Sequence, residues 1–202
     1  MAALAVGLSA CGSEEETATA ATSEPPATTA SSETSAAEPS EPSTPAGDIG
    51  PAKATAPGTE LEVGETATVP FEYTSDKTGT IAITVTAIEQ GQESGLAEFG
   101  ERAKGLVPYF IKYKIENVGG TDLSYANLDL RAVTADGRST GVVIAGDVPG
   151  KCESETADKD FTTAGATFET CNLQASRAGV EVTGAEFDEG DEYSDNPVVW
   201  TK

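Results

Sequence analysis

The five residues from Gly137 to Gly141, GRSTG, match the pattern G-x-S-x-G that surrounds the nucleophilic serine of many hydrolases. That chemistry needs a sharp turn from a strand into a helix, and a histidine that removes the serine proton. The chain contains no histidine, and Asp136-Gly137 predicts a turn. We therefore interpret Ser139 as part of a loop. Since the missing histidine also removes most acid–base catalysis at neutral pH, we expect no enzyme.

Acidic residues crowd the segment GAEFDEGDEYSDN, residues 184–196. Hard cations such as calcium bind several oxygen ligands from a flexible loop. The spacing does not match the loop of an EF-hand, so a solvated acidic loop is the simpler interpretation. Apart from calcium, no cofactor is expected. Paired carboxylates also serve glycosidases, but in a chain with 34 acidic residues such pairs carry little information. The weak calcium candidates are Asp188, Glu189, Asp191 and Asp195.

The first cysteine lies where an apolar run meets an acidic segment, in LSACGSEEE, residues 8–16. Residues 1–10 are uncharged and too few to span a bilayer as a helix, which favours the remnant of a secretory signal peptide. Leu8-Ser9-Ala10-Cys11 resembles the lipobox of bacterial lipoproteins. The resemblance implies lipidation of Cys11, cleavage before it, and a lipid anchor in the cell membrane that faces the extracytoplasmic side. No basic residue precedes Lys53, so we expect Met1 to be an internal start or the sequence to be truncated.

Cys152 and Cys171 remain as an even pair in an oxidising compartment, and we expect a disulfide between them. In the chain-entropy model such a bond stabilises the fold by about 3 kcal/mol. Two buried free thiols and a redox-active pair are the alternatives, although the spacing is wider than Cys-x-x-Cys. Trp200 follows both cysteines, so the Cys…Trp…Cys order of antibody domains is not met.

Composition divides the chain in two. Residues 11–58 contain Ile49 as their single large apolar residue, so we expect a disordered tether rich in Thr, Ala, Ser, Pro and Glu. Residues 59–202 have the size and the apolar content of one folded domain.

The net charge of −22 makes nucleic acid a poor partner. A plainly solvated surface and an acidic docking face for a basic partner both fit this charge.

Short stretches of alternating apolar and polar residues recur along residues 59–202, with turn residues between them. The clearest example places Ile81, Ile83 and Val85 on one face of a strand. About eight such stretches predict an all-β domain with two packed sheets, and a closed barrel is the alternative. A short helix or a long loop is expected from Leu96 to Ala103. The expected strands lie within ATVPFEY, TIAITVTAIEQG, YFIKYKIENVGG, NLDLRAVTADG, GVVIAG, TFETCNLQA, GVEVTGAEF and PVVWT.

The order of LEVGETATV, IAITVTAIEQG, PYFIKYKIENVGG, LDLRAVTADG and PVVW resembles an immunoglobulin-like domain-of-unknown-function family of actinobacterial and other Gram-positive lipoproteins. The resemblance implies an immunoglobulin-like β-sandwich outside the membrane and supplies no catalytic residues. We predict a non-catalytic interaction module for an envelope protein or polymer. The alternatives are a ligand- or calcium-binding lipoprotein of a transport or sensing system, and a passive structural protein of the envelope.

Overall fold

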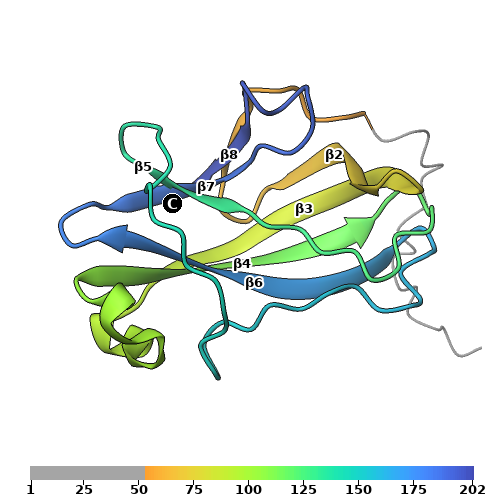
Figure 1. The fold of residues 1–202 in the computed structure, drawn as a ribbon. Helices are drawn as coiled ribbons and strands as arrows, with labels where there is room; N and C mark the ends of the chain where they lie inside the picture. Colours follow the sequence, from red (N-terminus) through yellow and green to blue (C-terminus); the bar gives the residue numbers. More distant parts are fainter. Residues whose placement is uncertain (1–52) are drawn as a thin grey trace, which may run out of the picture. The chain divides into compact units, whose positions relative to one another are not determined.

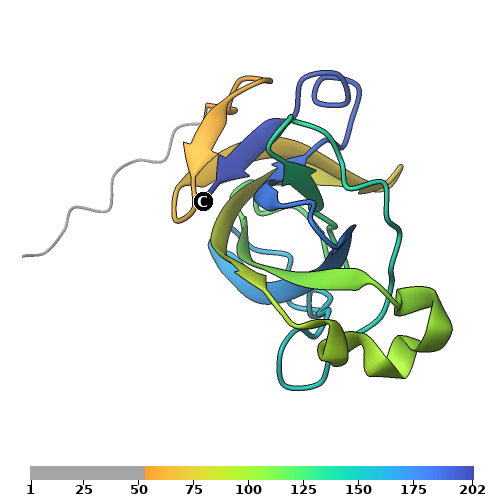
Figure 2. The ribbon, with the colours of Figure 1, turned by 90° about the vertical axis from the view of Figure 1, so that its left-hand side faces the viewer.

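In the computed structural model, which describes residues 53–202, the chain folds into two β-sheets that pack face to face (Figures 1 and 2). The first sheet has the order β1-β8-β7-β5 and the second β2-β3-β4-β6. Neighbouring strands are antiparallel, except that β1 runs parallel to β8. The bounds are β1 Glu60–Glu62, β2 Thr66–Thr74, β3 Lys77–Gln90, β4 Leu106–Asn117, β5 Arg131–Thr134, β6 Ala166–Arg177, β7 Val182–Phe187 and β8 Val198–Thr201. The expected all-β sandwich of about eight strands is confirmed, with two separate sheets instead of a closed barrel.

Alternation along the strands builds the second sheet. Ile81, Ile83 and Val85 of β3 are buried and face the first sheet, while the residues between them are more exposed. Each apolar residue on this face loses contact with water and contributes about 1.5–3 kcal/mol. The register places Ile83 opposite Ile115 of β4, so the buried faces of the two strands coincide. The sequence pattern therefore predicts both the strands and their buried face correctly.

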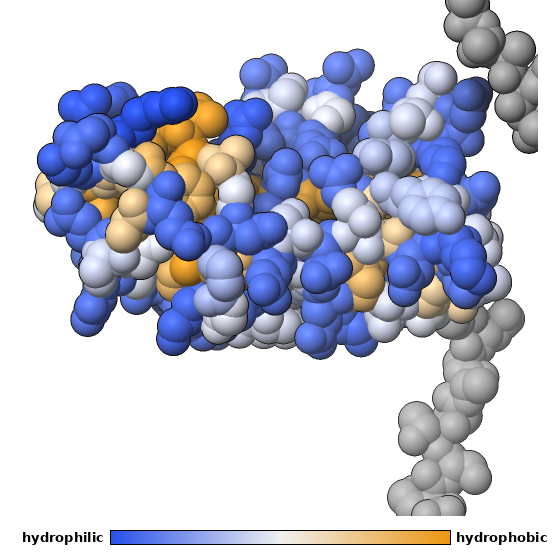
Figure 3. All heavy atoms as spheres, turned by 60° about the horizontal axis from the view of Figure 1, so that its bottom comes forward, coloured by the Kyte–Doolittle hydropathy of each residue, from blue (hydrophilic) through white to orange (hydrophobic). Residues whose placement is uncertain are grey.

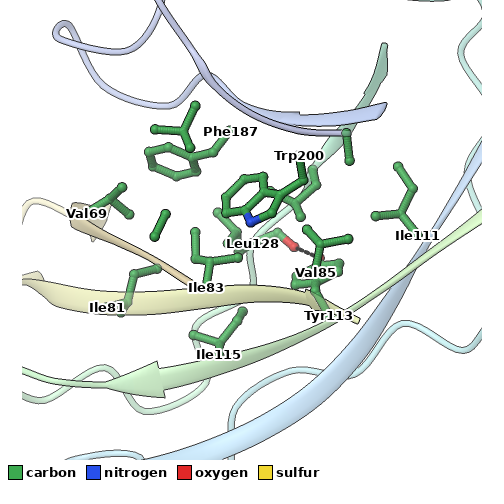
Figure 4. Close-up of a cluster of buried hydrophobic side chains, with 14 of the residues drawn as sticks. Val69, Ile81, Ile83, Val85, Ile111, Tyr113, Ile115, Leu128, Phe187 and Trp200 are labelled. Atoms are coloured by element: carbon green, nitrogen blue, oxygen red, sulfur yellow. Dashed lines mark hydrogen bonds between the residues drawn. The ribbon is translucent and has the colours of Figure 1, made fainter. Parts of the chain in front are cut away.

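Trp200 on β8 occupies the centre of the space between the sheets (Figure 4). Its side chain is fully buried, and its indole N–H donates a hydrogen bond of 3.0 Å to the carbonyl oxygen of Glu65. Gly184 on the neighbouring strand β7 allows close approach here, because a Cβ at that position would lie 2.6 Å from the carbonyl oxygen of Trp200. The last strand, β8, therefore contributes the central side chain of the core.

The segment GVVIAG, Gly141–Gly146, was expected to be a strand, and this prediction is wrong. After β5 the chain turns at Asp136 and Gly137 and returns alongside β5, with a single bridge between Val133 and Ser139. Gly141 then adopts a φ of +66°, a conformation that glycine reaches without strain, and the chain leaves the sheet. The apolar composition of the segment is that of a strand, but its backbone has no strand beside it among residues 53–202.

The expected short helix is a 3-10 helix, η1, which spans Glu93–Ala103 and is interrupted at Gly100. Leu96 and Ala103 on η1 are buried against a second apolar cluster on the outer face of the second sheet. The cluster includes the expected disulfide between Cys152 and Cys171, whose Cα atoms lie 5.2 Å apart. The disulfide therefore fixes the loop before β6 to that strand, beside η1.

Residues before the expected domain boundary at residue 59 also contact the sandwich. The N–H of Thr55 donates to the carbonyl oxygen of Thr68 (2.7 Å), and the hydroxyl of Tyr193 donates to the carbonyl oxygen of Thr55 (2.8 Å). The expected signal remnant (residues 1–10), the lipidated Cys11 and most of the expected tether lie outside the described residues. In residues 53–202, no helix is long and apolar enough to cross a membrane.

Candidate functional site

A groove of about 950 Å³ opens between β5, the edge strand of the first sheet, and β6, the edge strand of the second. The chain that follows β5 crosses from one sheet to the other (Figure 1). Residues 139–147 of this segment line the groove. The groove is lined by residues 129–132, 139–147, 171–174 and 188–189, together with Asn127 and Ser154. Its position follows from the strand order, since both edge strands end the sheets on the same side of the sandwich.

The floor of the groove is fixed by Asn172 on β6, which is only 6% exposed. Its Oδ1 accepts hydrogen bonds of 2.6 Å from the N–H of Leu130 and from the hydroxyl of Tyr113. Its Nδ2 donates a hydrogen bond of 2.6 Å to Oδ1 of Asp129. One buried amide thus connects β4, β6 and the chain before β5, which holds the groove in a defined shape.

Tyr113 adds a second connection to the same segment. Its hydroxyl also donates to the carbonyl oxygen of Leu128, so the two acceptors share one hydrogen (Figure 4). Burial, and the negative charges of Asp129 and Glu189, raise the pKa of Tyr113 well above its usual value. The phenol therefore remains protonated and continues to donate at all physiological pH values.

The charges in the groove are mostly negative. Asp129, Asp147, Asp188 and Glu189 line it, against Arg131 as the one basic side chain among the lining residues that the structure describes. Arg131 forms an ion pair of 3.0 Å with Asp188. Burial, followed by the charges of Asp129 and Asp188, raises the pKa of Glu189 to about 7. The groove therefore favours a cationic ligand, because a cation lowers the mutual repulsion of these carboxylates.

The segment Gly141–Gly146, which we call the strap, forms one wall of the groove. On its other side, a smaller apolar hollow of about 320 Å³ separates the strap from η1. Phe99, Ala103 and Leu106, together with the basic Arg102, line this hollow opposite the strap. Val143 on the strap is 98% exposed. Figure 3 shows apolar residues gathered at its left, at the end of the domain that carries η1.

The structure separates the four calcium candidates. Asp188 and Glu189 line the groove, whereas Asp191 and Asp195 are exposed in the turn that follows and do not line it. Within residues 53–202 no three His, Cys, Asp or Glu side chains are grouped so that they could hold a metal ion. The first two candidates instead lie near Asp129, which sequence reasoning missed. The sequence contains one indication of this position: Asp129 lies between Leu128 and Leu130, whose side chains are buried. In an extended chain its side chain therefore points to the opposite face, away from the core.

The pattern G-x-S-x-G lies in the loop after β5, as expected. Gly137 has a φ of +74° in the turn, and Ser139 forms the bridge to Val133 before the chain continues into the strap. No helix follows, so the geometry of a nucleophile elbow is not formed. Ser139 nevertheless lines the groove, where its hydroxyl is a polar group available to a ligand.

Comparisons with known proteins return little similarity. No protein-family model matches the chain, and no curated protein matches it. Among solved structures, a secreted protein from Mycobacterium tuberculosis, MPT63, has 14% sequence identity and a TM-score of 0.47. The alignment covers 73% of this chain and 100% of MPT63. The class defined by the structure itself is a β-sandwich of two four-stranded sheets with an acidic groove between its sheet edges.

Proposed function

We propose that this chain is a lipid-anchored extracytoplasmic protein whose immunoglobulin-like domain acts as a non-catalytic interaction module for an envelope protein or polymer. The observation that carries the proposal is the groove of about 950 Å³, with its acidic lining and the apolar strap along it. Binding surfaces typically combine a concave shape with a few polar groups held in place by a rigid scaffold. Asn172 supplies that rigidity here, because it connects the strands and the loop that form the groove.

The chemistry of the groove favours binding over catalysis. The chain has no histidine, so Ser139 in the groove lacks the usual base that would activate it as a nucleophile. The polar side chains that line the groove are four carboxylates, three amides, three hydroxyls and one guanidinium. The carboxylates among them bind cations and hydrogen-bond donors, which are common features of proteins and envelope polymers. The net charge of −22 makes nucleic acid an unfavourable partner.

The location rests on the N-terminal sequence and on the disulfide. Leu8-Ser9-Ala10-Cys11 resembles a lipobox, and the Cys152–Cys171 disulfide is typical of compartments outside the cytosol. Acylation at Cys11 would hold the protein at the membrane if at least two chains are attached. The domain would then be displayed on the extracytoplasmic side.

Mass spectrometry of the protein extracted from its own membranes tests this proposal. We expect a mature chain that begins at Cys11 and carries a diacylglyceryl group. The matched variant Cys11→Ser keeps the side-chain size but cannot form the thioether, so it should leave the membrane fraction. An unmodified chain that still contains Met1 would contradict the anchor.

A small-molecule ligand is the second candidate, because the volume of the groove lies within the usual range for such sites. This would make the chain a ligand-binding lipoprotein of a transport or sensing system. Native mass spectrometry of the protein purified from its own cells distinguishes the two. A bound small molecule that is lost in groove variants favours the ligand, whereas a protein or polymer partner favours the interaction module.

A further inference from the structure

The strap forms no strand pairing within residues 53–202, but its side chains keep the alternation of a strand. Among residues 53–202, the backbone N–H and C=O groups from Val143 to Gly146 form no hydrogen bond with another residue. Val142 donates to the hydroxyl of Thr140 at 3.3 Å, and the next backbone pairing begins at Val148 with Cys152. Its side chains alternate as in a β-strand: Val142 and Ile144 are half-buried, and Val143 and Ala145 are exposed. A row of unpaired backbone groups on an apolar segment is a template for another strand.

Glycines at both ends separate the strap from the sheets. Gly141 has a φ of +66° and Gly146 a φ of +133°. Gly146 also packs closely against Phe99 of η1, since a Cβ there would lie 3.0 Å from the Phe99 ring. The disulfide holds the chain a few residues further on, at Cys152. The strap is therefore held at both ends, while its central residues remain free to pair.

Hollows flank the strap on both sides. The acidic groove contains Val143, Ile144 and Ala145 in its lining, and so does the apolar hollow beside η1. When an extended peptide pairs with a strand, its side chains point alternately to opposite faces, and pockets on those faces select them. Here the hollow beside η1, lined by Phe99 and Leu106 with Arg102 as its one charged residue, suits an aliphatic side chain and disfavours a basic one, whereas the acidic groove suits a basic one.

We propose that the strap is a docking strand to which an extended peptide of alternating apolar and basic residues is added. This inference rests on the proposed function as an interaction module and names its partner class. Charge argues against a second copy of the chain as the occupant. Residues 53–202 carry 26 acidic and 12 basic side chains, so two such domains repel one another while a basic peptide is attracted.

The test uses the full chain with Cys11→Ser, so that no lipid is attached, and a synthetic peptide. The probe is the capped heptapeptide Lys-Val-Lys-Val-Lys-Val-Lys, with Glu-Val-Glu-Val-Glu-Val-Glu as the charge control. Two further probes carry N-methyl groups on all valines or on all lysines, because these two sets of N–H groups point to opposite edges of a strand. Affinities are measured by isothermal titration calorimetry, and amide hydrogen exchange of the strap is followed by NMR.

We expect the lysine–valine peptide to bind and the glutamate–valine peptide not to bind. One of the two N-methylated peptides should bind about tenfold more weakly, because it loses the paired edge, while the other keeps its affinity. Alternate amides of the strap should exchange at least about tenfold more slowly in the complex, because pairing along one edge protects every second N–H. If the two N-methylated peptides bind alike, or if the strap amides remain unprotected, strand addition is refuted.

A pair of matched variants locates the site. Val143→Lys places a repelling charge on the strap, and Val180→Lys makes the same change at another exposed valine that does not line the groove. Because both side chains are exposed, we expect both variants to fold. The first should weaken binding of the lysine–valine peptide about tenfold and the second should not. Equal weakening in both would refute the strap as the site. Membrane extraction tests the anchor independently, so failure of the docking strand and failure of the proposed function are distinguishable.

Discussion

The substitution Glu189→Gln removes the groove carboxyl whose pKa is shifted most from its usual value. Burial and the charges of Asp129 and Asp188 raise the pKa of Glu189 from 4.5 to about 7. Between these two pH values the native protein retains a proton that the unfolded chain has lost. The carboxyl therefore contributes no penalty below about pH 4.5, and its ionisation makes the native state progressively less stable as the pH rises to about 7. Above that pH the full penalty is present.

The size of the effect follows from the shift. In a fully shielded site, a change from 4.5 to about 7 would correspond to about 3 kcal/mol. Glu189 keeps contact with solvent, which screens the interaction, so we expect a penalty of about 1 kcal/mol. Glutamine has nearly the same shape and cannot ionise. The variant should therefore be about 1 kcal/mol more stable than the wild type at pH 8 and equally stable at pH 4.

Urea unfolding at both pH values measures this difference, with the fluorescence of the buried Trp200 as the signal. Other carboxylates titrate in the same range, but their contributions cancel when the two proteins are compared at one pH. Glu192→Gln is the matched control, because it removes an exposed glutamate from the same loop outside the groove. A difference that is the same at pH 4 and pH 8, or a gain of equal size in both variants, would refute the electrostatic description of the groove.

The remaining predictions concern the disulfide, the buried side chains of Asn172 and Trp200, and calcium. Replacing Cys152 and Cys171 by alanine should cost about 3 kcal/mol in urea unfolding, and no loss would mean that the loop is held by its packing alone. Asn172→Ala should cost about 3 kcal/mol because it leaves the N–H of Leu130 buried without a partner, and a loss below about 1 kcal/mol would contradict its role in the groove. Trp200→Ala should cost about 4 kcal/mol through the cavity it leaves, as measured by thermal unfolding, and a loss as small as that of a surface substitution would contradict its place in the core. Millimolar calcium should leave the melting temperature unchanged, and an increase of several degrees would indicate a bound ion.

Much of the sandwich could be predicted from local patterns. Ile81, Ile83 and Val85 alternate with more polar residues, and only one face of the sheet is buried, so periodicity specifies both the strand and its orientation. The pairing of Cys152 with Cys171 followed from their even number. These inferences succeed because each depends on neighbours in the sequence or on a simple count.

The strap and the groove could not be predicted in this way. GVVIAG has the composition of a strand, but pairing depends on where the chain goes after Gly141, and the positive φ of this residue takes the segment away from β5. The groove gathers Asp129, Asn172 and Glu189 from three separate parts of the chain. They meet because the strand order brings the edges β5 and β6 together, and no local pattern specifies that order.

The most direct test of the interaction module is site-specific photo-crosslinking of the full-length, lipid-anchored protein in its own cells. A photoreactive residue at Val143 reports on the strap, and the same residue at Val180 is the control outside the groove. We predict that one envelope species is captured from position 143, and that position 180 captures none of it. Equal capture from both positions, or no capture from position 143 while the protein is displayed normally, would contradict the assignment of the groove and its strap as the interaction surface.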